Sequence, residues 1–430
     1  MKKVFNLALP SIISNITIPL LGLVDLAIVG HMGNVTYIGA IAVGSMIFNV
    51  LYWLCGFLRM GTSGMTSQAF GKRDLTEVMR LLVRSLTIAM YVALLFVFCQ
   101  IPIRNLALIL MHPSEQIATQ VSIYFSICIF GAPAMLGLYS MTGWYIGMQN
   151  THIPMMVSIM QNIVNIVLSL VFVYQLDMKI EGVALGTLLA QWTGFIVAVV
   201  CWVHYYGRLN NYHWLKNLFN LYDIRSFFSV NRDIFIRTLF FISVNFFFIS
   251  SGAQQGDIIL SVNTLLMTLF TIFSYIMDGF AYAGEALCGK YYGARNRNAF
   301  NHTHRCLFAW GIIMTVVFTL VYAVGGNNFL MLLTNEKSIV SAASPYFWWA
   351  VMIPIVSVAA FIYDGIFIGI TATKYMLTSS FAAALGFFVV YLLTKHMLGN
   401  HALWLAFLVF LSLRGGVEWI FYMRKIAVWC

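Results

Sequence analysis

The chain has 430 residues, of which 61% are hydrophobic and 9% charged, with a formal net charge of +10 and a mean hydropathy of +0.86. Charged residues make up about 25% of a typical soluble domain. The composition therefore excludes a soluble protein and predicts an all-α integral membrane protein. We expect its basic residues to follow membrane topology and not to bind nucleic acid.

Apolar runs of roughly 20 residues cross a bilayer as helices, and the sequence holds twelve of them. In the first half they lie near residues 5–30, 36–58, 80–103, 118–143, 154–175 and 183–205. In the second half they lie near residues 234–252, 258–286, 304–325, 340–369, 375–394 and 402–422. The predicted organisation is an N-terminal lobe of six spans (1–206), a polar cytoplasmic linker (207–233) and a C-terminal lobe of six spans (234–430).

The loops between these spans carry an uneven charge. Most Lys and Arg, Arg84 and Arg237 among them, fall on one side of a twelve-span arrangement. The positive-inside rule then predicts that both termini are cytoplasmic. The first apolar run contains an acid and lacks a small-residue cleavage site, so we expect it to be retained as a span and not removed as a signal peptide.

The two halves repeat each other. Gly33, Gly56, Gly61 and Gly71 recur as Gly256, Gly279, Gly284 and Gly293, at a nearly constant displacement of half the chain. Gly143-Trp-Tyr-Ile-Gly147 recurs as Gly365-Ile-Phe-Ile-Gly369 in the same register. With an even number of spans per half, the repeats have the same orientation, as in transporters that work by alternating access.

The first span contains the features that point most strongly to function. Pro10 and Pro19 each remove a helical hydrogen bond and favour a kink. Asp25 follows about twenty mostly apolar residues, and a carboxylate at that depth costs at least about 2.5 kcal/mol on insertion scales. Such a group is a candidate proton carrier or, when ionised, a Na⁺ ligand. The alternative is a hydrated acid at the outer interface.

Two later spans of the first half carry polar side chains. Asn162 and Asn165 share a helical face, Ser169 continues it by one turn, and Thr187 lies in the next span. Such residues also join membrane helices, and that packing role stays open for each alone. Together with Asp25, they could surround one cation.

The second half has three candidate acids, each with an open structural alternative. Asp278 and Glu285 lie two helical turns apart on one face, and Asp364 stands directly before the repeated glycine motif. Arg414 and Glu418 have the spacing of a self-neutralising pair.

Catalysis and metal chemistry have little support in the sequence. The seven cysteines have no Cys-x-x-Cys spacing, and the nine histidines are mostly isolated. We therefore expect no enzyme, no cofactor and no metal site other than Na⁺ at Asp25, Asn165 and Thr187. Some of the aromatic residues, 16% of the chain, would suit flat cationic substrates.

These motifs resemble the multidrug and toxic compound extrusion (MATE) family, and its DinF-like branch in particular. The resemblance covers essentially the whole chain. It rests on Leu7-Ala8-Leu9-Pro10, Leu23-Val24-Asp25, Gly143 to Asn150, Asn162-Ile-Val-Asn165, Asp278 to Ala286, Asp364 to Gly369 and Asn400 to Gly415.

The resemblance implies two pseudo-symmetric six-helix bundles and a secondary antiporter that exports amphipathic or cationic compounds in exchange for H⁺ or Na⁺. It implies coupling at Asp25 and bending of the first span at Pro10. Ser169 stands where many relatives carry a second acid, which favours protons over tightly bound Na⁺. The alternative is a flippase of lipid-linked saccharides from a related branch. We expect a monomer whose partners are small amphipathic substrates and the lipid bilayer.

Overall fold

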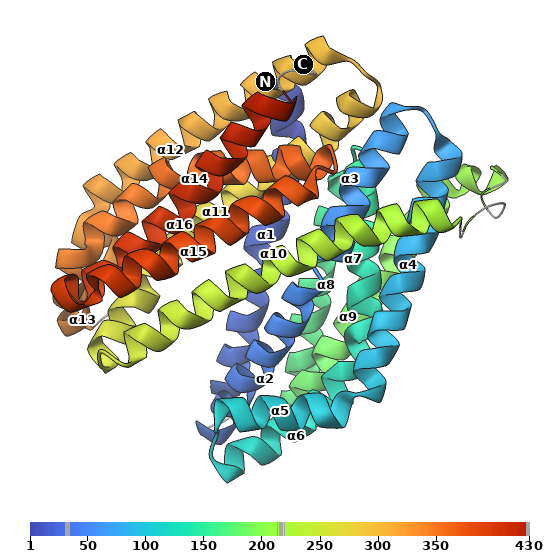
Figure 1. The fold of residues 1–430 in the computed structure, drawn as a ribbon. Coiled ribbons are helices and arrows are strands. Elements are labelled where there is room, and N and C mark those ends of the chain that lie inside the picture. Colours follow the sequence, from blue (N-terminus) through green and yellow to red (C-terminus); the bar gives the residue numbers. More distant parts are fainter. Residues whose placement is uncertain (31–34, 213, 215–217, 219, 335, 427–430) are drawn as a thin grey trace. The chain divides into compact units, whose positions relative to one another are not determined.

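The computed structural model describes residues 1–30, 35–212, 214, 218, 220–334 and 336–426. Throughout this part of the chain the secondary structure is helical, without strands (Figure 1). Gly33 of the glycine repeat lies outside the described residues, as does the side chain of Pro19.

The contacts divide the chain into two units. Unit 2 comprises Ile13–Ser226, and unit 1 comprises Met1–Ile12 together with Phe227–Cys430. Helices α1 (Lys2–Gly30) and α10 (Leu221–Ala253) each have residues in both units. Helix α10 begins inside the segment expected to be a polar linker.

Unit 2 also contains helices α2 to α9 and three short 3₁₀- or π-helical segments. These are α2 (Val35–Leu54), α3 (Phe57–Gly71), α4 (Leu75–Phe98), α5 (Gln100–Met111), α6 (Glu115–Cys128), η1 (Ile129–Gly131), α7 (Ala132–Gly147), α8 (His152–Leu170), η2 (Val171–Gln175), α9 (Ile180–Tyr206) and η3 (Gly207–Asn211). The span predicted at 36–58 is broken at Cys55 and Gly56 and continues as α3.

Unit 1 is built on the same plan. Its further elements are α11 (Asp257–Gly293), α12 (Arg297–Leu333), α13 (Lys337–Ala343), η4 (Ser344–Tyr346), α14 (Phe347–Gly369), α15 (Thr373–Leu398), α16 (Asn400–Phe421) and η5 (Tyr422–Ile426). The helical path of α12 is interrupted at Gly326, which has a φ of 44°, next to the predicted end of that span at 325.

The predicted membrane spans are confirmed. Eleven described segments from Thr36 onward are long and apolar enough to cross a membrane. Helix α1, with 29 residues, accounts for the first predicted span. Each predicted span begins in a helix that starts before the apolar run, in the flanking polar segment, although α4 ends at Phe98, before the predicted end of its span at 103. Asp74, for example, accepts a hydrogen bond from the backbone N–H of Glu77 at the start of α4.

The internal repeat is visible in the closest backbone contacts of each unit. A Cβ atom on Gly143 would lie 2.3 Å from the carbonyl oxygen of Arg59, and a Cβ on Gly365 would lie 2.3 Å from that of Ala281. Arg59 and Gly143 of the first half therefore correspond to Ala281 and Gly365 of the second half, at the displacement of the glycine repeat. In each unit, only a glycine lets the two helices approach this closely.

Helix ends repeat with the same displacement. Asn296 caps α12 by accepting from the N–H of Ala299, as Asp74 caps α4. Arg73 and Arg295 both have positive φ, at 61° and 53°. Helix caps, positive-φ residues and close helix contacts all recur at the displacement of the glycine repeat. The two units are therefore structural repeats of each other.

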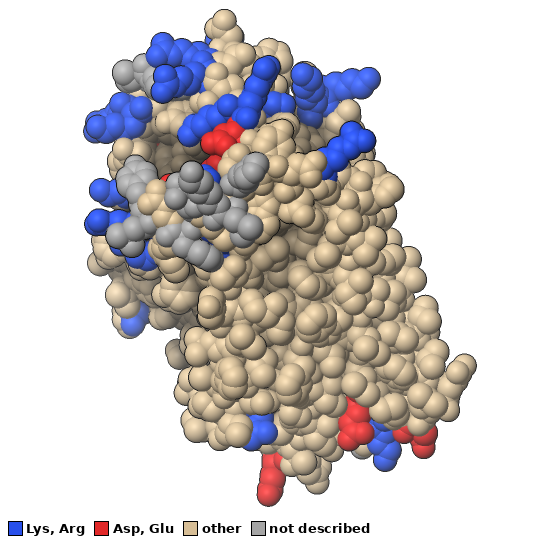
Figure 2. Space-filling model, turned by 90° about the vertical axis from the view of Figure 1, so that its right-hand side faces the viewer, with Lys and Arg blue, Asp and Glu red and all other residues tan. Residues whose placement is uncertain are grey.

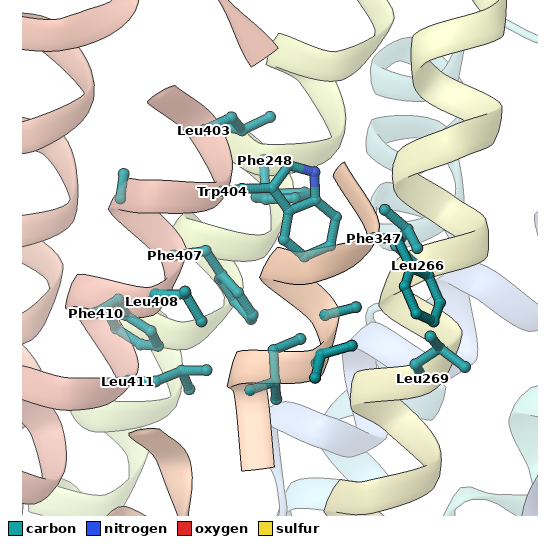
Figure 3. Close-up of a cluster of buried hydrophobic side chains, with 14 of the residues drawn as sticks. Phe248, Leu266, Leu269, Phe347, Leu403, Trp404, Phe407, Leu408, Phe410 and Leu411 are labelled. Carbon is teal, nitrogen blue, oxygen red and sulfur yellow. The ribbon is translucent and has the colours of Figure 1, made fainter. Parts of the chain in front are cut away.

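The core of unit 1 is a cluster of large apolar side chains. Phe248, Leu266, Phe347, Trp404 and Phe407 are all buried within it, and they come from four helices (Figure 3). Trp404 lies 5.1 Å from Phe248 between ring centroids, in an edge-to-face arrangement. Such pairs contribute about 0.5–1.5 kcal/mol beyond burial and fix α16 against α10.

Basic residues gather at one end of the face in Figure 2, above a wide band that carries no charge. Arg84 and Arg237, which were counted among the basic residues of the cytoplasmic side, are not surface charges, because only 3% and 6% of their surfaces are exposed. Arg84 donates to Glu77, to Asp223 and to the carbonyl of Leu218. This arginine of α4 therefore holds both the segment before α10 and the first turn of α10.

Candidate functional site

Three helices of unit 2 bring the predicted cation residues of the first half together. Asp25 comes from α1, Asn165 and Ser169 from α8, and Thr187 from α9. At most 8% of any of these side chains is exposed. Asp25 is therefore enclosed by protein and is not an exposed acid.

A chain of hydrogen bonds joins three of these residues. The Asn165 amide donates to Thr187 Oγ1 at 3.0 Å, and the Thr187 hydroxyl donates to Asp25 Oδ2 at 3.5 Å. The second bond is long for O–H···O and correspondingly weak. Thr187 thus links the amide and the carboxylate but satisfies only one carboxylate oxygen.

Three oxygens of this cluster have no hydrogen-bond partner in the part of the chain that the structure describes. They are Asp25 Oδ1, Asn165 Oδ1 and Ser169 Oγ, and all three are buried. An unsatisfied buried polar group costs about 1–3 kcal/mol, and more when it is charged. The cluster therefore favours a bound proton, cation or water.

The close approach of α8 and α9 places Ser169 in this cluster. A Cβ on Gly186 would lie 2.5 Å from Ser169 Oγ. Because Gly186 has no side chain, Ser169 fits against α9 directly beside Thr187. A larger residue at position 186 would push the two helices apart.

The structure does not bring Asn162 into the cluster. Its amide donates to the backbone carbonyl of Thr17 at 2.8 Å, about two turns before Asp25 on α1. Thr17 also hydrogen-bonds to Ser158 of α8 at 3.0 Å. Asn162 thus helps to hold α1 against α8, in agreement with the packing alternative.

Pro10 lies on the part of α1 that belongs to unit 1 and is buried there. Close by, Gly279 of α11 approaches Ala8 and Ile12, and Phe5 stacks on Trp310 with centroids 5.0 Å apart. Helix α1 is therefore packed in unit 1 before Ile13 and in unit 2 from Ile13 onward.

The second half contains a different polar cluster. Asp364 Oδ2 accepts hydrogen bonds from both Arg237 of α10 and Arg414 of α16. Arg237 and Arg414 each lie over the ring of Phe241 at 4.7 Å. Because its charge is neutralised by two guanidinium groups, Asp364 is held more firmly than Asp25.

The expected pairing of Arg414 with Glu418 is wrong. Arg414 pairs with Asp364, and Glu418, which is fully buried, accepts from the Ser379 hydroxyl at 2.9 Å. The same Asp364 oxygen also accepts from a second arginine, Arg237. Arg237 and Ser379 were not expected at this cluster, since Arg237 stands close to the start of its predicted span.

The other acids of the second half lie on α11. Glu285 is 1% exposed, and its backbone carbonyl would lie 2.8 Å from a Cβ on Gly369 of α14. Asp278 is half-buried.

No group of three or more His, Cys, Asp or Glu side chains in the described residues could hold a metal ion. The oxygens of the Asp25 cluster are of the type that Na⁺ accepts.

Two repeated all-α units of membrane-spanning helices, with buried polar clusters, define an integral membrane transporter. The MatE family model matches residues 10–171 and 234–392, which lie in the two halves. The chain belongs to this family of transporters, as its motifs indicated.

Relatives and solved structures agree with this assignment. The chain is 38% identical to the DNA damage-inducible protein F of Escherichia coli over 421 residues, which covers 96% of the chain and 90% of the relative. It is 21% identical to the mouse multidrug and toxin extrusion protein 2, covering 79% of the chain and 59% of the relative. The fold matches a crystal structure of MATE in the bent conformation, with a TM-score of 0.89 at 17% identity, covering 100% of the chain and 96% of that structure.

Proposed function

We propose that the protein is a secondary active antiporter that exports amphipathic or cationic organic compounds in exchange for H⁺ or Na⁺ by alternating access. Membership in a family with multidrug and toxin extrusion transporters supports export. The observation that carries the coupling role is the buried carboxylate of Asp25 beside two further oxygens without partners.

The Asp25 cluster is the proposed binding site of the coupling ion. When Asp25 is ionised and the site is empty, a negative charge stays buried with one oxygen unpaired, and this state is costly. A proton on Asp25 removes the charge, whereas Na⁺ would be held by oxygens of Asp25, Asn165, Ser169 and Thr187. Either ion stabilises the loaded form.

Coupling also requires an element whose conformation both ligands affect. Antiport follows only if substrate and cation favour different states of the protein, because equal affinity for both states shifts nothing. Helix α1 is our candidate, since it carries Asp25 and has residues in both units. We propose that it bends at Pro10, where the helical hydrogen-bond ladder lacks one donor.

We further propose that the protein works as a monomer in the bacterial inner membrane, with both termini cytoplasmic. The charge distribution supports this orientation, because Lys and Arg gather at one end of the face in Figure 2.

The test is transport by the purified protein in proteoliposomes with separately imposed proton and sodium gradients. The substrate panel is a set of dyes, bile acids and organic cations. Uphill movement of at least one compound, driven by one of the two gradients, supports antiport. Facilitated movement that only equilibrates the compounds, whichever gradient is imposed, contradicts it.

One variant distinguishes the two ions. Ser169→Ala removes an oxygen that only Na⁺ would use as a ligand, so a sodium-driven transporter should bind Na⁺ roughly tenfold more weakly. A proton-driven transporter should keep its pH dependence, because the proton sits on Asp25.

A further inference from the structure

Unit 1 contains a groove that the antiport mechanism does not use. Helices α12 and α16 both pack on α14 (Figure 1), and a cavity of about 410 Å³ lies between them. This volume is within the range of about 300–1,000 Å³ that small-molecule sites occupy. The lining residues are His304, Phe308, Ala359, Tyr363, Gly415, Gly416 and Trp419.

Glycines on α16 create the space. Gly415 packs closely on α14, where a Cβ would lie 2.8 Å from the backbone nitrogen of Ala360. Gly416 has no atom within 4 Å of its would-be Cβ, so the groove is open beside it. Trp419 forms part of the rim and is 53% exposed.

The walls are aromatic, with one unsatisfied polar atom. His304 stacks on Tyr422 with centroids 4.6 Å apart and planes 8° from parallel. Its Nε2 is buried and has no hydrogen-bond partner among the residues that the structure describes. An occupant with an apolar body and one polar group would therefore fit the lining.

The groove opens on a face suited to lipid. Ile312, Val316, Leu320 and Val324 on α12 are all between 51% and 84% exposed. On α16, Ile420 directly follows Trp419 and is 43% exposed. Exposed apolar side chains in this density belong against acyl chains in a membrane protein.

Positive charge lies at one end of the groove. Arg305 follows His304 on α12, and Arg424 and Lys425 lie in η5 directly after α16. All three side chains are exposed. The acid nearest in sequence, Glu418, is fully buried. Arg and Lys in this setting attract anionic headgroups, and arginine binds phosphate oxygens through paired N–H donors.

We propose that this groove binds one anionic phospholipid, with an acyl chain between α12 and α16 and its phosphate at Arg305 and Arg424. The His304 Nε2 would then face the glycerol and ester region, where hydroxyl and carbonyl groups are available. The site is contained in unit 1 and does not depend on the ion that drives transport.

The experiment measures quenching of Trp419 fluorescence by brominated acyl chains. Full-length protein is reconstituted in vesicles that hold brominated phosphatidylglycerol or brominated phosphatidylcholine at equal mole fraction. The Trp419 signal is the part of the emission that Trp419→Phe removes. We expect stronger quenching by the anionic lipid. Equal quenching by both lipids would mean ordinary, unselective lipid contact and would overturn the proposal.

Two variants test the position of the lipid. Gly416→Phe fills the groove without a clash at its Cβ and should abolish the selective quenching, whereas Gly207→Phe, at another glycine with open space, should not. The double variant Arg305→Gln/Arg424→Gln should lose about fivefold in preference for the anionic lipid per charge removed. Lys179→Gln/Lys395→Gln, at two exposed lysines elsewhere, is its control. Unchanged selectivity in both test variants would place the lipid outside the groove.

Discussion

At the scale of single residues, the buried carboxylates of Asp25 and Asp364 differ in how their charge is neutralised. Asp25 has a weak bond from Thr187 and an unpaired oxygen, whereas Asp364 is held by Arg237 and Arg414. A buried carboxylate with few hydrogen-bond donors is stabilised by a bound proton or cation, whereas one held by two arginines already has its counter-charge. We therefore assign ion exchange to the Asp25 cluster and a role in stability to the Asp364 cluster.

Thr187 is expected to matter through its hydroxyl. Thr187→Val keeps the shape of the side chain but removes the link between Asn165 and Asp25, so coupled efflux should fall several-fold. Thr187→Ser keeps the hydroxyl and should remain close to the unmodified protein. Gradient-driven efflux in proteoliposomes measures both, and equal rates for the Val and Ser variants would exclude the link.

Asp364 is expected to contribute mainly to folding. Asp364→Asn removes the carboxylate to which both buried guanidinium groups donate, and breaking a buried pair costs about 3–5 kcal/mol. Unfolding in detergent should show this loss, while Asp257→Asn, at an exposed acid, should change little. Adding Arg237→Gln to Asp364→Asn should recover part of the stability. Strict additivity of the two changes would show that the residues do not interact.

At the scale of helices, the repeated glycines set the distance between neighbours. A Cβ atom added to Gly143 on α7 or to Gly365 on α14 would lie 2.3 Å from a backbone carbonyl oxygen of the neighbouring helix. Alanine at either position must push the helices apart. The cost of such overpacking is about 1–3 kcal/mol.

We expect Gly143→Ala and Gly365→Ala to destabilise the protein by similar amounts, because the two contacts are equivalent in the repeat. Gly416→Ala is the matched control, since its Cβ would meet open space. The measurement is the unfolding midpoint of each variant in detergent. A loss confined to one half would contradict the equivalence of the two contacts.

Much of this organisation was predictable from helix periodicity and spacing. Apolar runs located the spans, and the constant displacement between matching glycines located the repeat. The sequence also grouped Asn162, Asn165, Ser169 and Thr187 with Asp25, and the structure brings all of them except Asn162 into one cluster with this carboxylate.

The partners of Arg237 could not be predicted in the same way. Helix α10 begins at Leu221, well before its apolar run, so Arg237 lies inside the helix and not near its start. The choice of Arg414 between Asp364 and Glu418 depends on how α10, α14 and α16 pack. No spacing within one helix contains that information.

At the scale of the whole molecule, orientation can be tested by labelling. Lys425→Cys and Lys395→Cys place thiols at exposed positions that the predicted topology assigns to opposite sides of the membrane. In a background with Cys99 and Cys430 replaced by Ser, an impermeant maleimide added to intact spheroplasts should label only Lys395→Cys. Labelling of Lys425→Cys instead would invert the topology.

The most direct test of the account is uphill export by Asp25→Asn compared with Asp177→Asn, an exposed acid with positive φ that asparagine also tolerates. Both variants are placed in proteoliposomes under the ion gradient that drives the unmodified protein. We predict that Asp177→Asn still concentrates substrate against its gradient, whereas Asp25→Asn binds substrate but cannot move it uphill. Uphill export by Asp25→Asn at the unmodified rate would contradict the coupling role of this carboxylate.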